Sequence, residues 1–409
     1  MRCASPLPNI FQSMAAPLAA LALLGSYAVT AAHNSQCSSE EAVVPSRASS
    51  LAQLQTHRHS SSTAGAIEED NDASHESNSA LCSQGKLLPE LYLLGAQKCA
   101  TTEFADDLMN SGVLSTGRLQ PAYGDGKKEW HFFDGFYLHE DARWDVEKAQ
   151  NRWLEALPPC PADSAATTSQ RVILAEMTPN NLMYLPYGSG FAMSDSSAND
   201  LTKSDTINLP STLAQFYGPL GQRLHFITLL REPLSRMQSG WYQSLTAKAV
   251  GLPGMEGTDG ANFHEDLVAG LEEAEKGRLS MLMFSSMYGR QLQGFLAPFS
   301  ASQFILMPYK LYTGDTQEEV CSIVSSVVGL PLHCQSPDAA DRALQHNEHP
   351  SLEEEVPPNL RIRYDSFMEP ENDLLVDVLL QAFLRGATLP LFHEEATQAN
   401  IKAWLTSAW

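Results

Sequence analysis

Short apolar runs recur along the chain, and three of them precede a stretch in which apolar positions have helical spacing. Continuous apolar strands that alternate with helices are typical of a parallel sheet with both faces covered. We therefore expect an α/β fold with a central parallel sheet flanked by helices, and ligands at the carboxyl ends of its strands. The expected strands lie at 91–94, 172–174, 224–230 and 304–307.

The expected helices follow the first, third and fourth of these runs. Phe104, Leu108 and Met109 give the first helical pattern, and a second extends through Trp241. The third covers residues 317–328.

The first 32 residues have the composition of a targeting segment: Arg2 is their only charge, and an apolar run extends from Ala15 to Ala32. Small residues near the end of the run suit a cleaved signal peptide. A run of about 18 apolar residues is also just enough to span a bilayer once as a signal-anchor. The weak positive flank leaves both interpretations open. Either way, we expect the chain to enter the secretory pathway.

Residues 33–86 are polar and rich in serine, with no apolar periodicity to offset the entropy of ordering. We expect a disordered stem in this segment and a folded catalytic domain over 87–409.

Charge and cysteine content narrow the classes of function. The 409 residues include 26 Lys and Arg against 48 Asp and Glu, a net charge of −22. A nucleic-acid partner is therefore not expected, although a local basic pocket for one small anion remains compatible with this charge. Cys321 and Cys334 flank a helix-like stretch and are a candidate disulfide in an oxidising lumen. No Cys/His cluster has metal-ligand spacing, so no metal is expected.

The segment 93–103 joins the first expected strand to its helix and has the composition of an anion-binding loop. Gly95 and small residues let the backbone approach a ligand, which the amides of the helix N-terminus then face. Lys98 adds a positive charge, and Thr101 and Thr102 add hydroxyl donors. The lysine stands too early for the GxxxxGK[ST] loop of nucleoside triphosphatases, and a simple capped helix is the alternative interpretation.

A second basic motif follows the third expected strand. Arg231 lies at the carboxyl end of that strand, Pro233 suits the first turn of a helix, and Ser239 lies about two turns along it. Such an arginine and serine can bracket a phosphate, because the guanidinium offers a forked set of donors. The alternative is a surface arginine and an unrelated serine.

A carboxylate and a histidine lie between the two basic motifs, in the segment Glu129-Trp130-His131-Phe132-Phe133-Asp134. Glu129 is a candidate general base, and His131 would assist or orient it. The alternative is an aromatic core segment whose histidine is hydrogen-bonded.

These three segments together resemble sulfotransferases that use 3′-phosphoadenylyl sulfate (PAPS). GAQKCATT resembles their 5′-phosphosulfate loop, G-x-x-K-[CGS]-G-T-[TS], with Ala100 in place of the usual glycine. The run from Arg231 to Ser239 resembles their 3′-phosphate motif, R-[DE]-P-x-x-R-x-x-S. EWHFFD resembles the E-x-H-F-F-D segment of the heparan sulfate glucosaminyl 3-O-sulfotransferases and related carbohydrate sulfotransferases.

The resemblance implies a P-loop-NTPase-like sulfotransferase fold, with PAPS as the donor co-substrate and no metal. It implies that Glu129 is the catalytic base, that His131 supports it, and that Lys98 stabilises charge on the leaving phosphate. The implied nucleotide-binding residues are Lys98, Cys99, Ala100, Thr101, Thr102, Arg231 and Ser239, and the implied substrate-binding residues are Lys128, Asp134 and Asn180.

Two segments depart from the family pattern. AEMTPNN resembles E-K-[ST]-P-x-Y, but Met177 stands where the family has a lysine that helps to hold substrate or phosphosulfate. Lys127 or Lys128 would have to substitute for that lysine. The K-G-R-x-H-P nucleotide loop is reduced to His349-Pro350, with Arg342 as the nearby cation that would compensate in part.

The predicted function is sulfuryl transfer from PAPS to a hydroxyl or amine of a carbohydrate-type acceptor. The expected location is the Golgi lumen, as a type II membrane protein, or outside the cell. The acidic net charge favours a glycan of low charge, whereas the resemblance favours a glycosaminoglycan-like acceptor. Met177 and the altered loop at 345–350 support the alternative of a catalytically silent PAPS-binding or scaffold protein. A small-molecule kinase on a related fold is a third interpretation.

Overall fold

A computed structural model describes residues 79–119, 128–133, 146–161, 171–183, 208–249, 258–332, 334 and 355–409. The expected targeting segment, most of the expected stem, Lys127, Asp134, Arg342 and the loop at 345–350 lie outside these residues. All the described residues belong to one compact unit, Asp70–Trp409.

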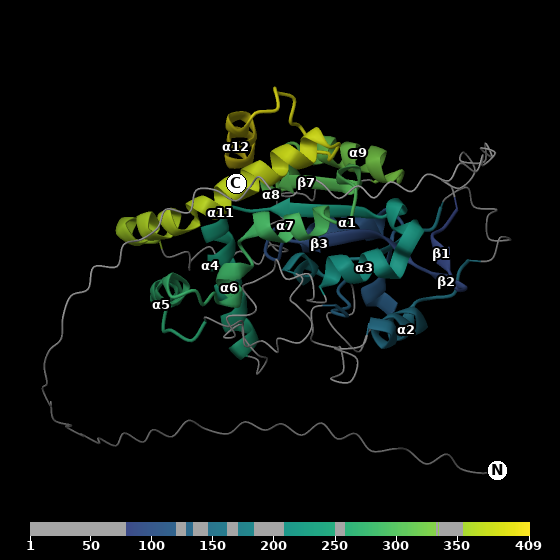
Figure 1. The fold of residues 1–409 in the computed structure, drawn as a ribbon, viewed down its shortest axis with the longest axis horizontal. Coiled ribbons are helices and arrows are strands. Elements are labelled where there is room, and N and C mark those ends of the chain that lie inside the picture. The colour runs from purple at the N-terminus through teal and green to yellow at the C-terminus, as the bar shows by residue number, and fades with distance from the viewer. Residues whose placement is uncertain are drawn as a thin grey trace, which may run out of the picture. The chain divides into compact units, whose positions relative to one another are not determined.

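A five-stranded sheet, in the order β4-β5-β3-β6-β7, forms the centre of the described fold. Every neighbouring pair of strands is parallel. All residues of β3, β5 and β7 are buried, so helices and loops cover both faces of the sheet, as Figure 1 shows. The predicted α/β class is confirmed. The strands are β3 (Pro89–Gly95), β4 (Leu114–Ser115), β5 (Leu174–Glu176), β6 (His225–Leu230) and β7 (Phe304–Pro308).

Three of the four predicted strands agree with the structure, and the other is displaced. The apolar run at 172–174 predicted a strand there, but β5 covers Leu174–Glu176. The strand ends at Glu176, whose carboxylate is buried. A search for apolar runs does not include a glutamate, so it stops before the end of this strand. The two-residue edge strand β4 gives no sequence signal of its own because it is too short to show a period.

The predicted helices are present. The one predicted at 317–328 has these bounds, and the other two lie where expected after β3 and β6. The α-helices are α1 (Thr101–Asn110), α2 (Val146–Ala156), α3 (Leu209–Tyr217), α4 (Pro233–Ala249), α5 (Phe263–Glu275), α6 (Met281–Phe284), α7 (Tyr288–Leu296), α8 (Tyr309–Thr313), α9 (Gln317–Val328), α11 (Pro358–Leu384) and α12 (Gln398–Ser407). Short 3₁₀ helices are η2 (Thr116–Leu119), η4 (Pro179–Met183), η5 (Gly218–Arg223) and η6 (Ala301–Gln303).

The longest helix of the described residues, α11, runs along the upper side of the fold in Figure 1, with α12 above it. The helix begins at Pro358 and contains Pro370. Leu360, Tyr364 and Met368 are buried in a small hydrophobic cluster that also contains residues of α4, α5 and α6. This packing explains why the helix extends ahead of the proline.

Two disulfides tie peripheral segments to the fold. The predicted bond between Cys321 and Cys334 is present, and a second joins Cys82 to Cys160. Cys82 belongs to a hairpin of β1 (Cys82–Ser83) and β2 (Lys86–Leu87), so paired strands begin ahead of residue 87. Both disulfides are compatible with an oxidising compartment.

The Asp107 carboxylate lies near the sulfurs of Cys321 and Cys334. Those sulfurs are bonded to each other, so they offer no thiolate to a metal ion. Within the described ranges, no helix combines the length and the apolar character that a membrane crossing requires.

Candidate anion-binding and proton-transfer site

Lys98 and Arg231, two of the predicted site residues, follow strands that end at the same edge of the sheet. β3 ends at Gly95, β5 at Glu176 and β6 at Leu230, and parallel strands all end on the same side. Lys98 follows the first of these ends and Arg231 the third. The order of the sheet places β3 between the other two strands, so the anion loop lies at the centre of this edge.

The loop after β3 approaches a neighbouring segment so closely that a side chain would not fit. A Cβ atom on Gly95 would lie 2.4 Å from the Pro179 carbonyl oxygen, and the residue has φ +142°. Two non-glycine residues in the loop, Lys98 and Ala100, have positive φ values of 69° and 59°. Ala100 is also the N-cap of α1 and makes no side-chain cap hydrogen bond. The positive φ of Ala100 therefore favours glycine at this position for reasons of backbone conformation.

Two arginines from the second motif bind the backbone of the loop. Arg231 Nη1 donates to the Lys98 carbonyl oxygen at 3.2 Å. Arg236, which is fully buried, donates through Nε to the Gln97 carbonyl oxygen at 3.2 Å and through Nη2 to the Gln97 side chain at 2.9 Å. The two motifs, more than a hundred residues apart in sequence, are thus in direct contact.

The electrostatics of the loop favour an anion. Burial lowers the pKa of the Lys98 ammonium, and the charges of Arg231 and Arg236 lower it further. Neither Lys98 nor Arg231 forms an ion pair with a carboxylate of the described residues, and the guanidinium of Arg231 lies 5.2 Å from the centroid of the Tyr309 ring. The charge of Glu103 acts in the opposite direction but does not outweigh these effects. Clustered cations that form no ion pair with a carboxylate are expected where a ligand supplies the negative charge.

Two buried polar atoms beside the loop have no hydrogen-bond partner in the described structure: Arg231 Nε and Thr228 Oγ1. Thr228 lies on β6 opposite Gly95, so both atoms are at the end of β6 next to the loop. Buried polar groups are rarely left unsatisfied. A bound ligand at this edge would satisfy them.

The remaining predicted nucleotide-binding residues differ in exposure. Cys99 is a free thiol and fully buried, and burial raises its pKa to about 11. Thr101 is buried at the first turn of α1, Thr102 is exposed, and Ser239 is half-buried on α4. The high pKa of Cys99 makes it a packing residue of the loop rather than a nucleophile.

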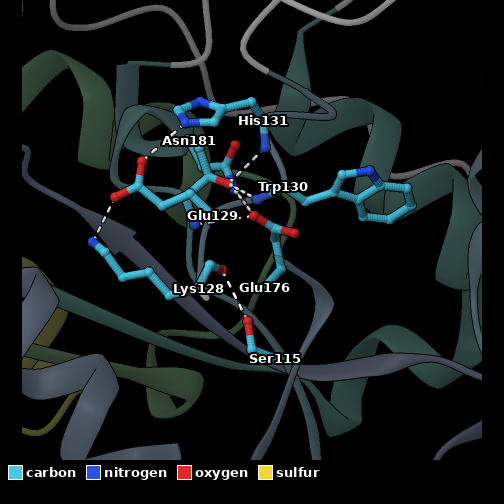
Figure 2. A network of polar contacts seen from close by, with 8 residues as sticks. Ser115, Lys128, Glu129, Trp130, His131, Glu176 and Asn181 are labelled. Carbon is cyan, nitrogen blue, oxygen red and sulfur yellow. Dashed lines mark hydrogen bonds and ion pairs between the residues drawn. The ribbon is translucent and has the colours of Figure 1, made fainter. Parts of the chain in front are cut away.

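The Glu129 carboxylate is held between two basic groups, as Figure 2 shows. Lys128 Nζ lies 2.6 Å from Glu129 Oε1, and His131 Nε2 lies 3.0 Å from Oε2. Lys128 has a side chain only 3% exposed, whereas about a fifth of the Glu129 and His131 side chains remains exposed. Both carboxylate oxygens therefore have partners, and part of the Glu129 side chain remains exposed to solvent.

The backbone of this segment is fixed by buried groups of β4 and of the turn that follows β5. Ser115 Oγ donates to the Lys128 carbonyl oxygen at 3.0 Å. The amides of Trp130 and His131 both donate to Thr178 Oγ1, at 3.2 and 3.1 Å. A Cβ atom on Gly117 would lie 2.5 Å from the Lys128 carbonyl carbon, so only glycine allows this approach. The position of Glu129 thus depends on contacts with distant segments.

Glu176 is the buried anchor of this network (Figure 2). It accepts hydrogen bonds from Thr116 Oγ1 at 2.5 Å, the Thr178 amide at 3.0 Å and Asn181 Nδ2 at 3.3 Å. Because Thr178 binds the amides beside Glu129, the buried carboxylate reaches the candidate base through one intermediate residue. Thr178 also precedes Pro179, whose carbonyl oxygen abuts Gly95. The segment around Glu129, here called the base segment, and the loop that carries Lys98, called the anion loop, therefore both contact the stretch from Thr178 to Pro179.

The two carboxylates have pKa values shifted in opposite directions. Burial raises the pKa of Glu176, and its hydrogen bonds offset this only in part. Burial also acts to raise the pKa of Glu129, but hydrogen bonds from His131 and Lys128 and the lysine's charge bring it down to about 2. Glu129 is therefore ionised at neutral pH and is a weak base while both partners hold it.

An aromatic cluster packs behind the base segment. The Trp153 ring of α2 lies 5.3 Å from that of Phe133 and 6.4 Å from that of Phe132, measured between centroids. Trp153 is fully buried. Near the end of α2, Cys160 is bonded to Cys82, and Lys86 Nζ donates to the Leu157 carbonyl oxygen at 2.9 Å. Sequence reasoning missed Trp153, whose only signal is its place in an amphipathic helix.

The residues predicted to bind substrate, and Met177 in the position of the family lysine, differ in their location and contacts. Asn180 lies in η4, next to the contact with Gly95, and is buried. Met177 is fully buried, so its side chain is part of the core. Lys128, suggested as a substitute cation for that position, pairs with Glu129. Asp134 lies outside the described residues.

No protein-family model matches this chain, and no curated protein does either. Among solved structures, the chain is similar to a sulfotransferase from Alicyclobacillus acidocaldarius. The sequence identity is 15% and the TM-score 0.41, covering 71% of this chain and 96% of that chain. Function is therefore inferred below from the residues themselves.

Proposed function

We propose that this protein is a PAPS-dependent sulfotransferase with a carbohydrate-type acceptor. The observation that carries the proposal is the direct contact between two anion motifs at one sheet edge, where Arg231 and Arg236 hold the Lys98 loop. A donor with phosphate groups at two ends matches two such motifs, whereas a single-phosphate ligand would use only one of them.

At the 5′ end of the donor, the amides at the start of α1 and the hydroxyls of Thr101 and Thr102 would bind the phosphosulfate. Lys98 would offset the charge that develops on the departing phosphate oxygen. At the 3′ end, Arg231 and Ser239 would hold the phosphate. The unpartnered Nε of Arg231 supplies a donor for this purpose. The scheme uses no metal ion.

Glu129 would accept the proton of the acceptor hydroxyl or amine. The freed electron pair forms the bond to sulfur while the bond between sulfur and the phosphate oxygen breaks, and Glu129 keeps the proton until solvent removes it. With a pKa of about 2, Glu129 is a weak base in its pair with Lys128 and His131. The pair with Lys128 must therefore loosen during transfer, and a sulfonate beside the lysine would compete for it.

The acceptor class follows from charge and compartment. The net charge of −22 disfavours a long polyanion unless the cleft is locally basic, so a glycan of low charge is the preferred acceptor over a glycosaminoglycan. The two disulfides fit a protein of the secretory pathway, in the Golgi lumen or secreted. Acceptor screening at two ionic strengths separates the two acceptors, because transfer to a polyanion would depend strongly on salt.

The decisive experiment is calorimetry of the full chain with 3′,5′-adenosine bisphosphate, followed by transfer assays with labelled PAPS and a carbohydrate panel. We expect micromolar binding of the bisphosphate and transfer to at least one acceptor. A protein that neither binds the bisphosphate nor transfers label is not a PAPS user, and the proposal is then wrong.

A second candidate is a nucleotide-binding protein without transfer activity. Two observations favour it: Met177 is buried in the core, and Ala100 occupies a positive φ in the loop. Such a protein would bind the bisphosphate in the same calorimetric experiment and transfer nothing to any acceptor.

A further inference from the structure

The start of α11 packs against the start of α4, next to the motif assigned to the 3′-phosphate. Leu360 and Tyr364 of α11 are buried in one hydrophobic cluster with Leu234 and Met237 of α4. Arg361, between the two buried residues of α11, faces a different direction and is 44% exposed. The first turns of the two helices thus bring an arginine from the far end of the chain to this motif.

Glu232 links Arg361 to the 3′-phosphate motif directly. Its Oε1 lies 3.2 Å from Arg361 Nη2, and its Oε2 accepts from the Ser235 amide at 2.6 Å in the first turn of α4. Glu232 follows Arg231 in sequence, and Arg231 is the arginine that contacts the Lys98 loop. Arg361 therefore contacts the residue that follows Arg231 in sequence.

The guanidinium of Arg361 is fixed but not saturated. Nε lies 2.8 Å from both carboxylate oxygens of Asp365, one helical turn along α11, and Nη2 contacts Glu232. A guanidinium has five N–H donors, and none of those on Nη1 has a partner among the described residues. Two carboxylates thus orient the group, while the Nη1 donors remain without a partner among the described residues.

A second cation is what the 3′-phosphate needs. A phosphate monoester carries close to two negative charges at neutral pH, and Arg231 supplies one positive charge. The charged groups that contact Arg361 are the carboxylates of Glu232 and Asp365. The two carboxylates reduce the net charge that Arg361 offers, so its contribution is mainly a pair of oriented, charge-assisted donors.

We propose that Arg361 is a second binding residue for the 3′-phosphate of the nucleotide, oriented by Glu232 and Asp365. This inference rests on the proposed function, because it assumes a nucleotide with a 3′-phosphate. It predicts that Arg361 distinguishes nucleotides with a 3′-phosphate from those without one.

The test compares Arg361→Ala with Arg363→Ala in the full chain. Arg363 lies two residues along the same helix, has a side chain that is 37% exposed, and pairs with Glu275 of α5. Arg363→Ala therefore removes a similar ion pair that does not involve Glu232. Calorimetry with 3′,5′-adenosine bisphosphate and adenosine 5′-monophosphate measures each variant. We expect Arg361→Ala to weaken bisphosphate binding by about 5- to 20-fold and monophosphate binding by less than about twofold. Arg363→Ala should change neither.

The possible results distinguish an error in the role of Arg361 from an error in the proposed sulfotransferase function. A wild-type chain that binds no bisphosphate overturns both. A wild type that binds bisphosphate, with Arg361→Ala unchanged or equally weakened for the two nucleotides, overturns the role of Arg361 alone. If Arg361→Ala does not fold, Arg361→Lys serves instead. It keeps the charge but loses the orienting contacts, and we expect a smaller loss that is again confined to the bisphosphate.

Discussion

The anion loop and the base segment are neighbours at one sheet edge, yet they are organised by different means. Lys98 lies within a few residues of the end of β3, and its position follows from the strand, the tight turn and the helix. Glu129 belongs to no helix or strand, and contacts with Ser115, Thr178 and Gly117 hold its segment in place. The comparison teaches that the nucleotide side is a local motif, whereas the catalytic side is a product of tertiary contacts.

The largest expected effect is on transfer activity, which should depend on the base segment while nucleotide affinity depends on the anion loop. Glu129→Gln removes the proton acceptor while retaining the size of the side chain, so transfer should fall by about 10²- to 10⁴-fold. Affinity for 3′,5′-adenosine bisphosphate should stay within about twofold, because the loop residues are unchanged. Steady-state transfer assays and calorimetry check this. Equal transfer by the variant and wild type would remove Glu129 from the mechanism.

The next effect tests the buried support of the base segment. Glu176→Ala would leave Thr116, Thr178 and Asn181 without their acceptor, and we expect a loss of about 2–4 kcal/mol in the free energy of unfolding. Glu176→Gln is the matched control, since it retains an acceptor oxygen and needs no buried charge. Chemical denaturation measures both. If the alanine variant is as stable as the glutamine variant, the network does not depend on this residue.

A smaller effect concerns pH. The pKa of Glu129 is lowered in the folded protein from 4.5 to about 2, so its contribution to stability is present above pH 4.5 and lost as the pH falls towards 2. The stability difference between wild type and Glu129→Gln should therefore shrink between pH 6 and pH 3. Glu176, whose pKa burial raises, changes stability in the opposite direction, but it is common to both proteins. A difference that stays constant over this range would contradict the lowered pKa.

The smallest effect lies in the anion loop. Ala100 has φ 59°, a conformation that glycine adopts without the steric penalty of a Cβ atom. Ala100→Gly should raise the free energy of unfolding by up to about 1 kcal/mol and leave bisphosphate binding unchanged or tighter. Ala105→Gly, in the interior of α1, is the control and should destabilise by about 1 kcal/mol. Thermal unfolding of the two variants should shift the midpoint in opposite directions.

Sequence reasoning predicted the parts of the site that follow strands. The loop at Lys98 and the motif at Arg231 each carry a local pattern, and the alternation of strands and helices implies that the strand ends meet. The same reasoning selected Glu129 and His131 from their residue types and their place between the two basic motifs, and the family resemblance then supported the choice. It missed the Cys82–Cys160 bond, Trp153, Ser115 and Gly117, whose roles depend on residues far away in sequence.

The amino-acid sequence alone determined the α/β class and the strand ends that carry Lys98 and Arg231, and it made Cys321 and Cys334 a candidate disulfide. Apolar periods and short-range spacing encode these features. Tertiary structure alone decided that Arg231 binds the Lys98 carbonyl, that a buried Glu176 supports the base segment, and that Arg361 of α11 approaches the start of α4. These contacts join residues from about fifty to more than a hundred positions apart, and only the packing of the whole sheet and its helices brings them within bonding distance.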